Sequence, residues 1–357
     1  PMDLTQAGAG RKAYTFREPI GPVVAISAFN HPLNLIAHQV GPAVASGCPV
    51  LVKPAKDTPL SCKSFVQILY EAGLNENWCR FVPCSDEVAE KMVTDPRTAF
   101  FSFIGSARVG WMLRSKLAPG TRLALEHGGA APVLVDEGVA SGKVIPPLLK
   151  GGFYHSGQVC VSVQRVFVPR AELPDFAAEL AEGAEALTVG DPTKAETQCG
   201  PLIRPAEVDR VASWVDAAVQ GGARLAAGGK RTGSTLYQPT VLVDPPDDAD
   251  VSRKEVFGPV VCIYGYDDVD AAIGQANALP YAFQAAVFTD RMSWADYCVE
   301  TLAASAVMVN DHTAFRVDWM PFAGRRQSGL GTGGIGYTMA DMSEEKMVVV
   351  NAPSSVR

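Results

Sequence analysis

The sequence predicts an α/β protein with two doubly wound, parallel-sheet units. Short apolar runs rich in Val and Ile alternate with amphipathic segments through most of the chain, and this alternation indicates strand–helix–strand crossovers. The chain has 357 residues, which is too long for one ordinary domain and long enough for two cores. Its 47% apolar and 19% charged residues exclude a disordered protein.

The first predicted unit spans residues 20–128 and has the pattern of a nucleotide-binding fold. Runs such as GPVVAISA are continuous and apolar, as expected for strands buried on both faces of a parallel sheet. The expected strands are Gly21–Ala28, Pro49–Lys53, Ala99–Ile104 and Thr121–Leu125, and the expected helices are Pro59–Ala72, Asp86–Val93 and Ser106–Leu117.

A second α/β series follows, interrupted by loops rich in Gly, Pro and Asp. The tail Lys346–Asn351 is a further short β-run, and pairing outside its own subunit is one expectation for it. The expected strands of the second series are Ala131–Val135, Val163–Val168, Thr240–Val243, Val260–Tyr266, Ala285–Phe288 and Ala304–Val309, and its helices are Ala171–Ala186, Pro205–Gln220, Val269–Asn277 and Arg291–Leu302.

Charge and cysteine usage exclude several classes of function. The net charge is −7 and no run of basic residues occurs, which argues against nucleic-acid or anionic-membrane binding. No apolar stretch is long enough to span a bilayer, and Pro1–Arg11 lacks the apolar region of a signal peptide. The eight cysteines form no CxxC pair, so a metal site is not expected and a reduced, cytoplasmic setting is favoured.

The segment Phe153–Arg165 (FYHSGQVCVSVQR) has the densest chemical signal, because a Gly-Gln pair stands just before Cys160, with one residue between. This places the thiol on a turn leading into a regular element. A nucleophilic cysteine needs partial exposure and local stabilisation of its thiolate, such as a helix N-terminus gives. The alternative is a buried structural cysteine, which is the commoner role of a free thiol.

The surrounding motifs resemble the aldehyde dehydrogenase superfamily, in its NAD(P)-dependent, non-acylating branch. The Cys160 segment matches the pattern F-x-x-x-G-Q-x-C, and six further motifs match in the order of that family. The resemblance runs from about Arg17 to Val350. The other six are Phe29–Leu33 (FNHPL), Val52–Pro59 (VKPAKDTP), Phe103–Gly110 (FIGSARVG), Leu125–Gly129 (LEHGG), Glu255–Pro259 (EVFGP) and Met320–Gly329 (MPFAGRRQSG).

The resemblance implies oxidation of an aldehyde to a carboxylic acid through three catalytic residues. Cys160 would attack the carbonyl, Asn30 and the Cys160 backbone N–H would stabilise the oxyanion, and Glu126 would activate the hydrolytic water. Without the motif, Asn30 would be interpreted as a turn former. A Glu at the end of a buried strand is rarely structural unless it is paired, which favours the role of Glu126 as a base.

The resemblance also implies that NAD or NADP is the cofactor, although no GxGxxG fingerprint follows the first strand. The helix after Gly105 and Ser106 would bind the pyrophosphate, although such a pair is by itself usually only an N-cap. Glu255 would otherwise be interpreted as a solvated loop carboxylate. The implied cofactor residues are Ile26, Ser27, Phe29, Lys53, Lys56, Gly105, Ser106, Val109, Glu255 and Phe257.

Departures from the family pattern suggest details of specificity. Lys56 stands where many NAD-preferring members carry Glu, so we expect it to attract a 2′-phosphate and allow NADP, unless it points into solvent. His155 and Arg316 are the candidate substrate residues, and Arg316 lies between apolar neighbours. A small anionic aldehyde would partner Arg316. The alternative is an internal salt bridge to Asp318 or Asp311.

Three parts are implied: a nucleotide domain at 20–128, a catalytic domain at 129–330, and a β-extension for oligomerisation at 1–19 and 331–357. Such relatives are usually homodimers or homotetramers. They also carry a long N-terminal segment that we expect to be missing here. Alternatives are a non-catalytic relative of this fold acting as a binding or structural protein, a CoA-acylating enzyme, which would lack Glu126, and a papain-like hydrolase, in which the cofactor motifs would have no role.

Overall fold

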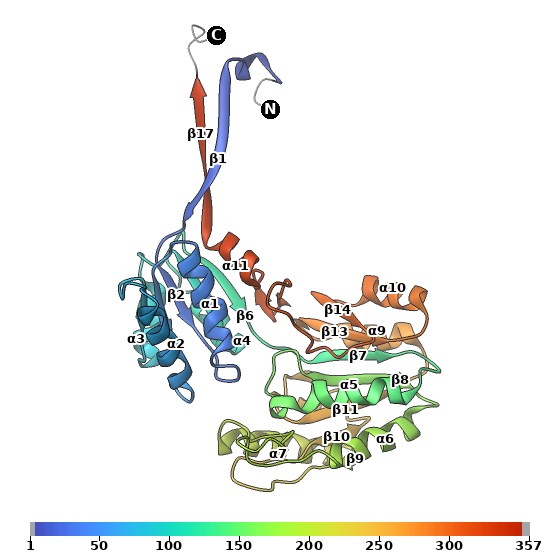
Figure 1. The fold of residues 1–357 in the computed structure, drawn as a ribbon. Coiled ribbons are helices and arrows are strands. Elements are labelled where there is room, and N and C mark those ends of the chain that lie inside the picture. The colour runs from blue at the N-terminus through green and yellow to red at the C-terminus, as the bar shows by residue number, and fades with distance from the viewer. Residues whose placement is uncertain (1–3, 352–357) are drawn as a thin grey trace.

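Two α/β lobes lie side by side in the computed structural model, which describes residues 4–351. A long two-stranded ribbon projects from the first lobe (Figure 1). The outermost parts of the expected β-extension, residues 1–3 and 352–357, lie outside the described residues. Both lobes have a mainly parallel sheet, as the alternating pattern predicts.

The first lobe contains a six-stranded sheet in the order β16-β6-β5-β2-β3-β4. All neighbours are parallel except β16, which returns from late in the chain and pairs antiparallel with β6. The strands are β2 (Val23–Ile26), β3 (Val50–Lys53), β4 (Cys79–Phe81), β5 (Phe100–Ile104), β6 (Arg122–Glu126) and β16 (Gly329–Leu330).

Helices cover both faces of this sheet because the strands are apolar on both sides. Val23 and Ala25 of β2 pack in one core with α1 and α2, whereas Val24 and Ile26 pack in the other with α3 and α4. The short α11 packs on α1. The helices are α1 (Asn34–Ala45), α2 (Pro59–Glu71), α3 (Asp86–Thr94), α4 (Ala107–Arg114) and α11 (Ile335–Asp341).

The second lobe contains a seven-stranded sheet in the order β14-β13-β7-β8-β11-β10-β9, and only the edge strand β9 is antiparallel. The central strand β8 is buried along its whole length. The strands are β7 (Ala131–Val135), β8 (Val163–Pro169), β9 (Arg224–Ala227), β10 (Thr240–Val243), β11 (Val260–Tyr266), β13 (Gln284–Phe288) and β14 (Ala306–Val309).

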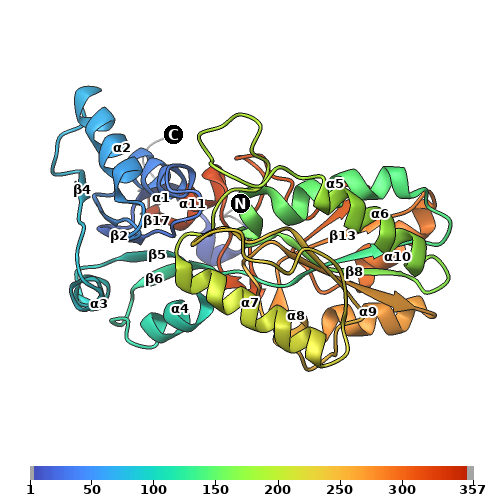
Figure 2. The same ribbon diagram turned by 90° about the horizontal axis from the view of Figure 1, so that it is seen from below.

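Two layers of helices cover the second sheet, as Figure 2 shows from below. One core contains residues of α5 and α6, and the other contains residues of α7, α8, α9 and α10. The helices of this lobe are α5 (Ser141–Phe153), α6 (Leu173–Glu185), α7 (Pro205–Gln220), α8 (Asp250–Arg253), α9 (Val269–Asn277) and α10 (Met292–Thr301). The minor elements of the chain are the short helices η1 (Gln6–Gly8) and η2 (Tyr154–Gly157) and the paired strands β12 (Tyr281–Ala282) and β15 (Arg325–Arg326).

The ribbon joins the two ends of the described chain. Strand β1 (Arg11–Pro19) pairs antiparallel with β17 (Ser343–Asn351) over nine residue pairs. The tail at 346–351 is therefore a strand, as expected, but its observed partner is β1 of the same chain. A two-stranded ribbon has two faces and two unpaired edges, and Tyr14, Phe16 and Met347 are exposed on it.

Four helices, α1, α5, α8 and α11, were not predicted from the sequence, and α1 and α5 are the longest of them. Pro42 lies inside α1, and Pro146 and Pro147 lie inside α5. Proline in a helix interior removes a hydrogen bond and costs about 3 kcal/mol. Burial of neighbours such as Ile36 and Leu148 offsets this cost. Among residues 4–351, no helix is long and apolar enough to cross a membrane.

Candidate active site

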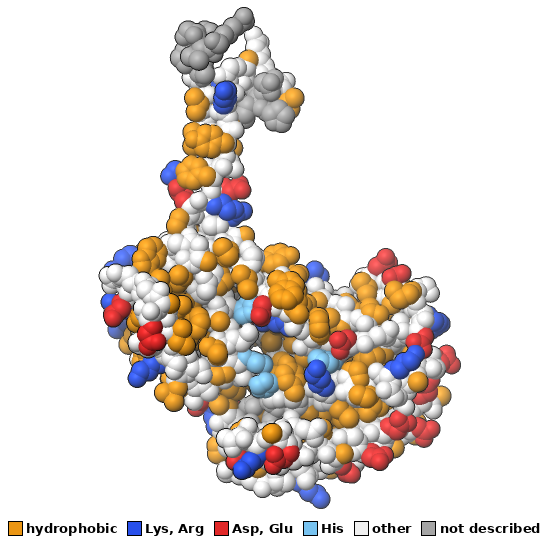
Figure 3. Space-filling view, viewed as in Figure 1, with side chains coloured by type: hydrophobic (Ala, Val, Ile, Leu, Met, Phe, Trp, Pro, Cys, Tyr) orange, Lys and Arg blue, Asp and Glu red, His pale blue; other side chains and the backbone are white. Residues whose placement is uncertain are grey.

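A cleft of about 760 Å³ opens between the two lobes. The carboxyl ends of β2, β3, β5 and β6 form one wall, and loops of the second lobe form the other. Figure 3 shows this hollow with histidine side chains near it. The volume is typical of a small-molecule site, and the carboxyl ends of parallel strands are where open α/β sheets bind ligands.

The cleft brings together residues that lie far apart in the sequence. Every predicted site residue except His155 lines it, and the ring centroid of His155 lies 4.5 Å from that of His31, which does line it. The predicted residues in the lining are Ile26, Ser27, Phe29, Asn30, Lys53, Lys56, Gly105, Ser106, Val109, Glu126, Cys160, Glu255, Phe257 and Arg316.

Cys160 follows a tight segment of left-handed backbone. His155, Ser156 and Gly157 have φ angles of 49°, 57° and 68°. A Cβ at position 157 would collide with the backbone carbonyl of Gly258, so this position requires glycine. The chain then turns through Cys160 into strand β8. The thiol therefore lies on a turn before a regular element, but that element is a strand.

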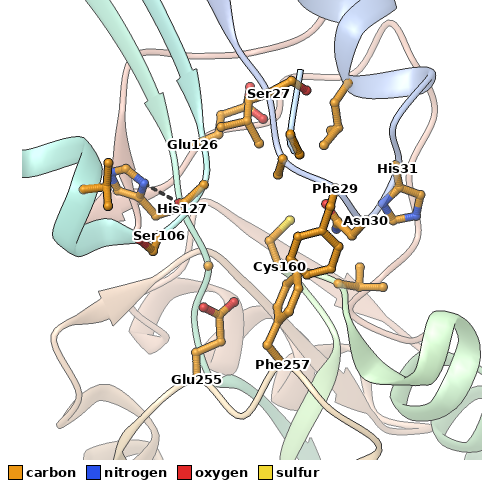
Figure 4. Close-up of a pocket in the computed structure, with 18 of the residues that line it drawn as sticks. Ser27, Phe29, Asn30, His31, Ser106, Glu126, His127, Cys160, Glu255 and Phe257 are labelled. Atoms are coloured by element: carbon orange, nitrogen blue, oxygen red, sulfur yellow. Dashed lines mark hydrogen bonds between the residues drawn. The ribbon is translucent and has the colours of Figure 1, made fainter. Parts of the chain in front are cut away.

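Because the chain after Cys160 continues into strand β8, that element supplies no helix N-terminus to stabilise a thiolate. Burial raises the pKa of the Cys160 thiol well above its ordinary value, and the carboxyl groups of Glu126 and Glu255 raise it further. The Arg316 guanidinium acts in the opposite direction. Figure 4 shows the two carboxyl groups on opposite sides of the thiol. The thiol consequently needs a base, or an additional positive charge nearby, before it can react as a thiolate.

Asn30 is held beside the Cys160 segment by a hydrogen bond across the cleft. Its Nδ2 donates to the backbone oxygen of Gln158 at 2.9 Å. Gln158 is itself fixed, because its Oε1 accepts from the backbone N–H of Ile203 at 2.8 Å. An amide has two N–H donors, so the second donor of Asn30 remains for a substrate oxygen near the thiol.

Glu126 is the last residue of β6, and its carboxyl group packs against Gly333. A Cβ at Gly333 would collide with Glu126 Oε1 in its present position, so the glycine leaves room for this side chain. Burial raises the pKa of Glu126 to about 7, although Arg316 partly opposes the shift. A carboxylate with a pKa near neutrality is well suited to act as a general base.

Glu255 approaches the backbone of the first lobe on the other side of the thiol. Its carboxyl group occupies the space that a Cβ at Gly128 would need, and its Oε1 is buried without a hydrogen-bond partner. Burial raises the pKa of Glu255 to about 8. The nearby Phe257 has a φ of 46° and meets Phe29 edge-on, with ring centroids 5.8 Å apart.

The N-terminus of α4 faces the same cleft. Ser106 occupies the N-cap position, but its side chain makes no capping hydrogen bond. His127 fixes the preceding residue, since its Nδ1 lies 2.8 Å from the Gly105 oxygen. The N–H groups of the first helical turn and the helix dipole favour an anion here. The Ser27 hydroxyl is also buried without a partner. These groups fit the phosphates and hydroxyls of a dinucleotide.

Lys56 does not simply point into solvent. Its Nζ donates to Asp86 Oδ2 at 3.1 Å, and Lys53 Nζ lies 3.7 Å from Asp86 Oδ1. Asp86, which also lines the cleft, is the first residue of α3. Sequence reasoning missed its role, because an acidic residue at a helix start is expected for the helix dipole alone.

Arg316 makes neither of the internal salt bridges that the sequence suggests. Its guanidinium stacks on the Phe322 ring, with Cζ 4.1 Å from the centroid, and one amino group lies 3.4 Å from His38 Nδ1. Asp318 instead pairs with His38 Nε2 at 2.9 Å, and Asp311 accepts from a backbone N–H. Among the described residues, no carboxylate lies within 4.0 Å of Arg316.

Several site residues carry little sequence signal. Gly333 belongs to a glycine-rich turn, and His38 lies within a helix that sequence reasoning missed. His31 is part of the FNHPL motif, and burial together with His155 and Arg316 lowers its pKa to about 4. Within residues 4–351, no group of three His, Cys, Asp or Glu side chains could hold a metal ion.

A cleft that suits phosphates and hydroxyls at one end and holds a thiol at the other fits a class of enzymes, the dinucleotide-dependent oxidoreductases. The chain belongs to the aldehyde dehydrogenase family, because the model of the "Aldehyde dehydrogenase family" matches residues 2–348. Two related aldehyde dehydrogenase structures contain the cofactors that the resemblance implies, one with NADP and the other with NAD⁺.

Relatives support this assignment along nearly the whole chain. The 3-sulfolactaldehyde dehydrogenase of Priestia aryabhattai is 37% identical over 98% of this chain and 73% of its own length. Aldehyde dehydrogenase 21 from Physcomitrella patens, in complex with its product succinate, is 35% identical with a TM-score of 0.95, over 99% of this chain and 74% of that chain. Glyceraldehyde-3-phosphate dehydrogenase from Methanocaldococcus jannaschii, complexed with NADP, is 33% identical with a TM-score of 0.92. The match covers 96% of this chain and 75% of that chain.

Proposed function

We propose that this protein oxidises a small anionic aldehyde to the corresponding carboxylate, with NAD or NADP as the hydride acceptor. One observation carries the proposal: Cys160, Asn30 and Glu126 line the same cleft as the cation Arg316. The names of two relatives are consistent with it. Sulfolactaldehyde carries a sulfonate, and succinate is the product of an aldehyde that carries a carboxylate.

The reaction begins at the thiol. Cys160 gives its proton to solvent water, and the resulting thiolate adds to the aldehyde carbon and forms a thiohemiacetal. Negative charge develops on the carbonyl oxygen, and the free N–H of the Asn30 amide and the Cys160 backbone N–H donate to it. When bound, the nicotinamide supplies the acceptor for the hydride that leaves the former aldehyde carbon. Loss of that hydride leaves a thioester on Cys160.

Hydrolysis of the thioester completes the reaction. Glu126, as a carboxylate, takes a proton from a water molecule that attacks the thioester carbon. The products are the free carboxylate and the regenerated Cys160 thiol. The substrate has gained one oxygen from water and lost one hydride, so the overall two-electron oxidation is balanced by reduction of the cofactor.

The residues of the cleft fit a dinucleotide that runs from the nicotinamide ribose through the pyrophosphate to the adenosine ribose. Glu255, with its unpartnered buried oxygen, would bind the hydroxyls of the nicotinamide ribose, and Phe257 would pack beside the ring. The α4 N-terminus after Gly105 and Ser106 would bind the pyrophosphate. Lys53, at the end of β3, would bind the adenosine ribose. Ile26, Ser27, Phe29, Lys56 and Val109 complete the proposed contacts.

Arg316 carries the preference for an anionic substrate. Arg316 is half-buried, and its Nε is buried without a hydrogen-bond partner. Such a cation is stabilised when an anion meets it, and Arg316 faces the groups around the thiol. The ring of His155, next to His31, would border the entrance for such a substrate. Because one Arg316 amino group contacts His38, His38 helps to orient the guanidinium.

We expect Arg316→Leu to lower kcat/KM for succinic semialdehyde by about 10- to 100-fold, because it removes a charge-assisted contact of about 1.5–3 kcal/mol. For butanal, an uncharged aldehyde of the same length, the effect should be small. The measurement is kcat/KM for both aldehydes with both cofactors, in wild type and variant. An equal loss for both aldehydes would show that Arg316 is structural. A wild type inactive with every anionic and uncharged aldehyde would refute the function itself.

The same proposal assigns a role to each part of the chain. Residues 20–128 would bind the nucleotide, and residues 129–330 would hold the catalytic machinery. Residues 1–19 and 331–357 would form an oligomerisation extension, based on the ribbon of β1 and β17. A reduced, cytoplasmic setting is part of the proposal, because the cysteines of the chain are free thiols in the structure.

Oligomerisation is expected because the ribbon exposes apolar side chains, among them Tyr14, Phe16 and Met347, and because its edges are unpaired. Light scattering should give the mass of a homodimer or homotetramer. Replacing these three side chains by Ser should reduce that mass to one chain. A wild type with the mass of a single chain would contradict the proposal.

A further inference from the structure

The adenosine end of the cleft holds a compact group of charges that the sequence did not predict. Asp86, at the start of α3, lies between Lys53, at the end of β3, and Lys56, three residues later. Its two carboxylate oxygens approach the two ammonium groups separately, at 3.7 Å and 3.1 Å. We refer to these residues as the Lys53–Asp86–Lys56 cluster.

The three members differ in exposure, and this difference defines their roles. The Lys53 side chain is only 8% exposed, whereas Asp86 is 74% exposed and Lys56 is 63% exposed. A nearly buried ammonium group requires a partner, and Asp86 supplies it. Both lysines, mainly Lys56, hold the pKa of Asp86 below its ordinary value, so its carboxylate is ionised at neutral pH. The open side of Asp86 faces the cleft.

The carboxylate changes how the two lysines act on a cofactor. Two free ammonium groups would attract a 2′-phosphate strongly. Asp86 cancels one of the two positive charges and places a like charge beside an incoming phosphate dianion, which is unfavourable. A ribose hydroxyl, in contrast, can donate a hydrogen bond to an ionised carboxylate. An expectation based on Lys56 alone, without Asp86, therefore overestimates the affinity for NADP.

We propose that Asp86 is the residue that selects NAD over NADP, by accepting a hydrogen bond from the adenosine ribose and by neutralising Lys56. The inference rests on the proposed function, because it requires the adenosine to lie at the carboxyl end of β3. Asp86 acts at the cofactor and not at the thiol. Its effect should therefore appear in cofactor binding without any aldehyde present.

The test measures dissociation constants for NAD⁺ and NADP⁺ by quenching of tryptophan fluorescence, since Trp214 lines the cleft. Wild type should bind NAD⁺ more tightly. Asp86→Asn should raise the affinity for NADP⁺ relative to NAD⁺ by about tenfold, because the phosphate then meets two unopposed lysines. Adding Lys56→Met to that variant should remove most of the gain.

Glu90→Gln is the matched control. Glu90 lies on the same helix and also pairs with a lysine, Lys116, at 2.8 Å, but it does not line the cleft. Its removal changes the net charge equally and should leave the affinity ratio unchanged. Asp86→Ser, which suits the helix start, provides a second variant, and thermal unfolding shows that each variant is folded.

The outcomes separate the two proposals. If wild type binds both cofactors but prefers NADP⁺, or if folded Asp86 variants keep the wild-type ratio, the role of Asp86 is wrong and the proposed function stands. If Glu90→Gln shifted the affinity ratio of NADP⁺ to NAD⁺ as much as the Asp86 variants do, the shift would come from net charge alone. That result would also overturn the inference. If wild type binds neither cofactor, both proposals fail.

Discussion

Cys160→Ser is expected to lower kcat by about a thousandfold or more, a barrier increase of about 4 kcal/mol. An alcohol near neutral pH is a far weaker nucleophile than a thiolate. The exchange of sulfur for oxygen is small in volume, so the fold and the affinity for NAD(P) should remain nearly intact. Steady-state kinetics and cofactor titration measure the two effects separately.

Cys199→Ser is the matched control for this experiment. Cys199 is also a free thiol, and its Sγ lies 3.6 Å from Ser156 in the segment that leads to Cys160. The same chemical change at this neighbouring position should leave kcat within a few-fold of wild type. If Cys160→Ser kept more than about a tenth of wild-type kcat, a change under about 1.4 kcal/mol, Cys160 would not be the nucleophile.

Glu126→Gln is expected to separate the two halves of the reaction. Thioester hydrolysis needs the carboxylate as a base and should slow by about 10²- to 10⁴-fold. Hydride transfer precedes that step, so a burst of NAD(P)H close to one equivalent per site should survive while steady-state turnover falls. Rapid mixing measures the burst and the steady state in one trace. An equal fall in both phases would place Glu126 before or during hydride transfer.

The pH dependence gives a second test of the same role. Burial raises the pKa of Glu126 to about 7, and only the deprotonated form can act as a base. Wild-type turnover limited by hydrolysis should therefore rise with pH through about 7, and Glu126→Gln should lose this rise. Glu255→Gln is the control, because it removes the other buried carboxyl group near the thiol. It should weaken cofactor binding and keep the hydrolytic step.

The fold was predictable where local pattern and burial agree. Continuous apolar runs such as Val163–Val168 became buried strands, and α7 (Pro205–Gln220) has the predicted bounds because proline begins it and a glycine follows it. Helices α1 and α5 were missed, since their internal prolines oppose helix formation locally. Only the buried faces of these helices, which come from tertiary packing, outweigh that cost.

The candidate catalytic residues that line the site were predictable from the sequence, but the electrostatics of these residues were not. Cys160, Asn30 and Glu126 stand in short motifs, and a motif is a property of the chain. The raised pKa values of Cys160 and Glu126 cannot be predicted from a motif, because they depend on burial and on charged residues that lie far away in the chain.

The sequence by itself determined the α/β class, most strands and the residues that bear the chemistry, since these depend on residue type and short-range spacing. The tertiary structure alone decided which charges meet. It paired Lys56 with Asp86, placed Arg316 on Phe322 beside His38, and packed Glu126 against Gly333. Electrostatic energies depend on distances between side chains and on their burial, and only the folded chain sets both.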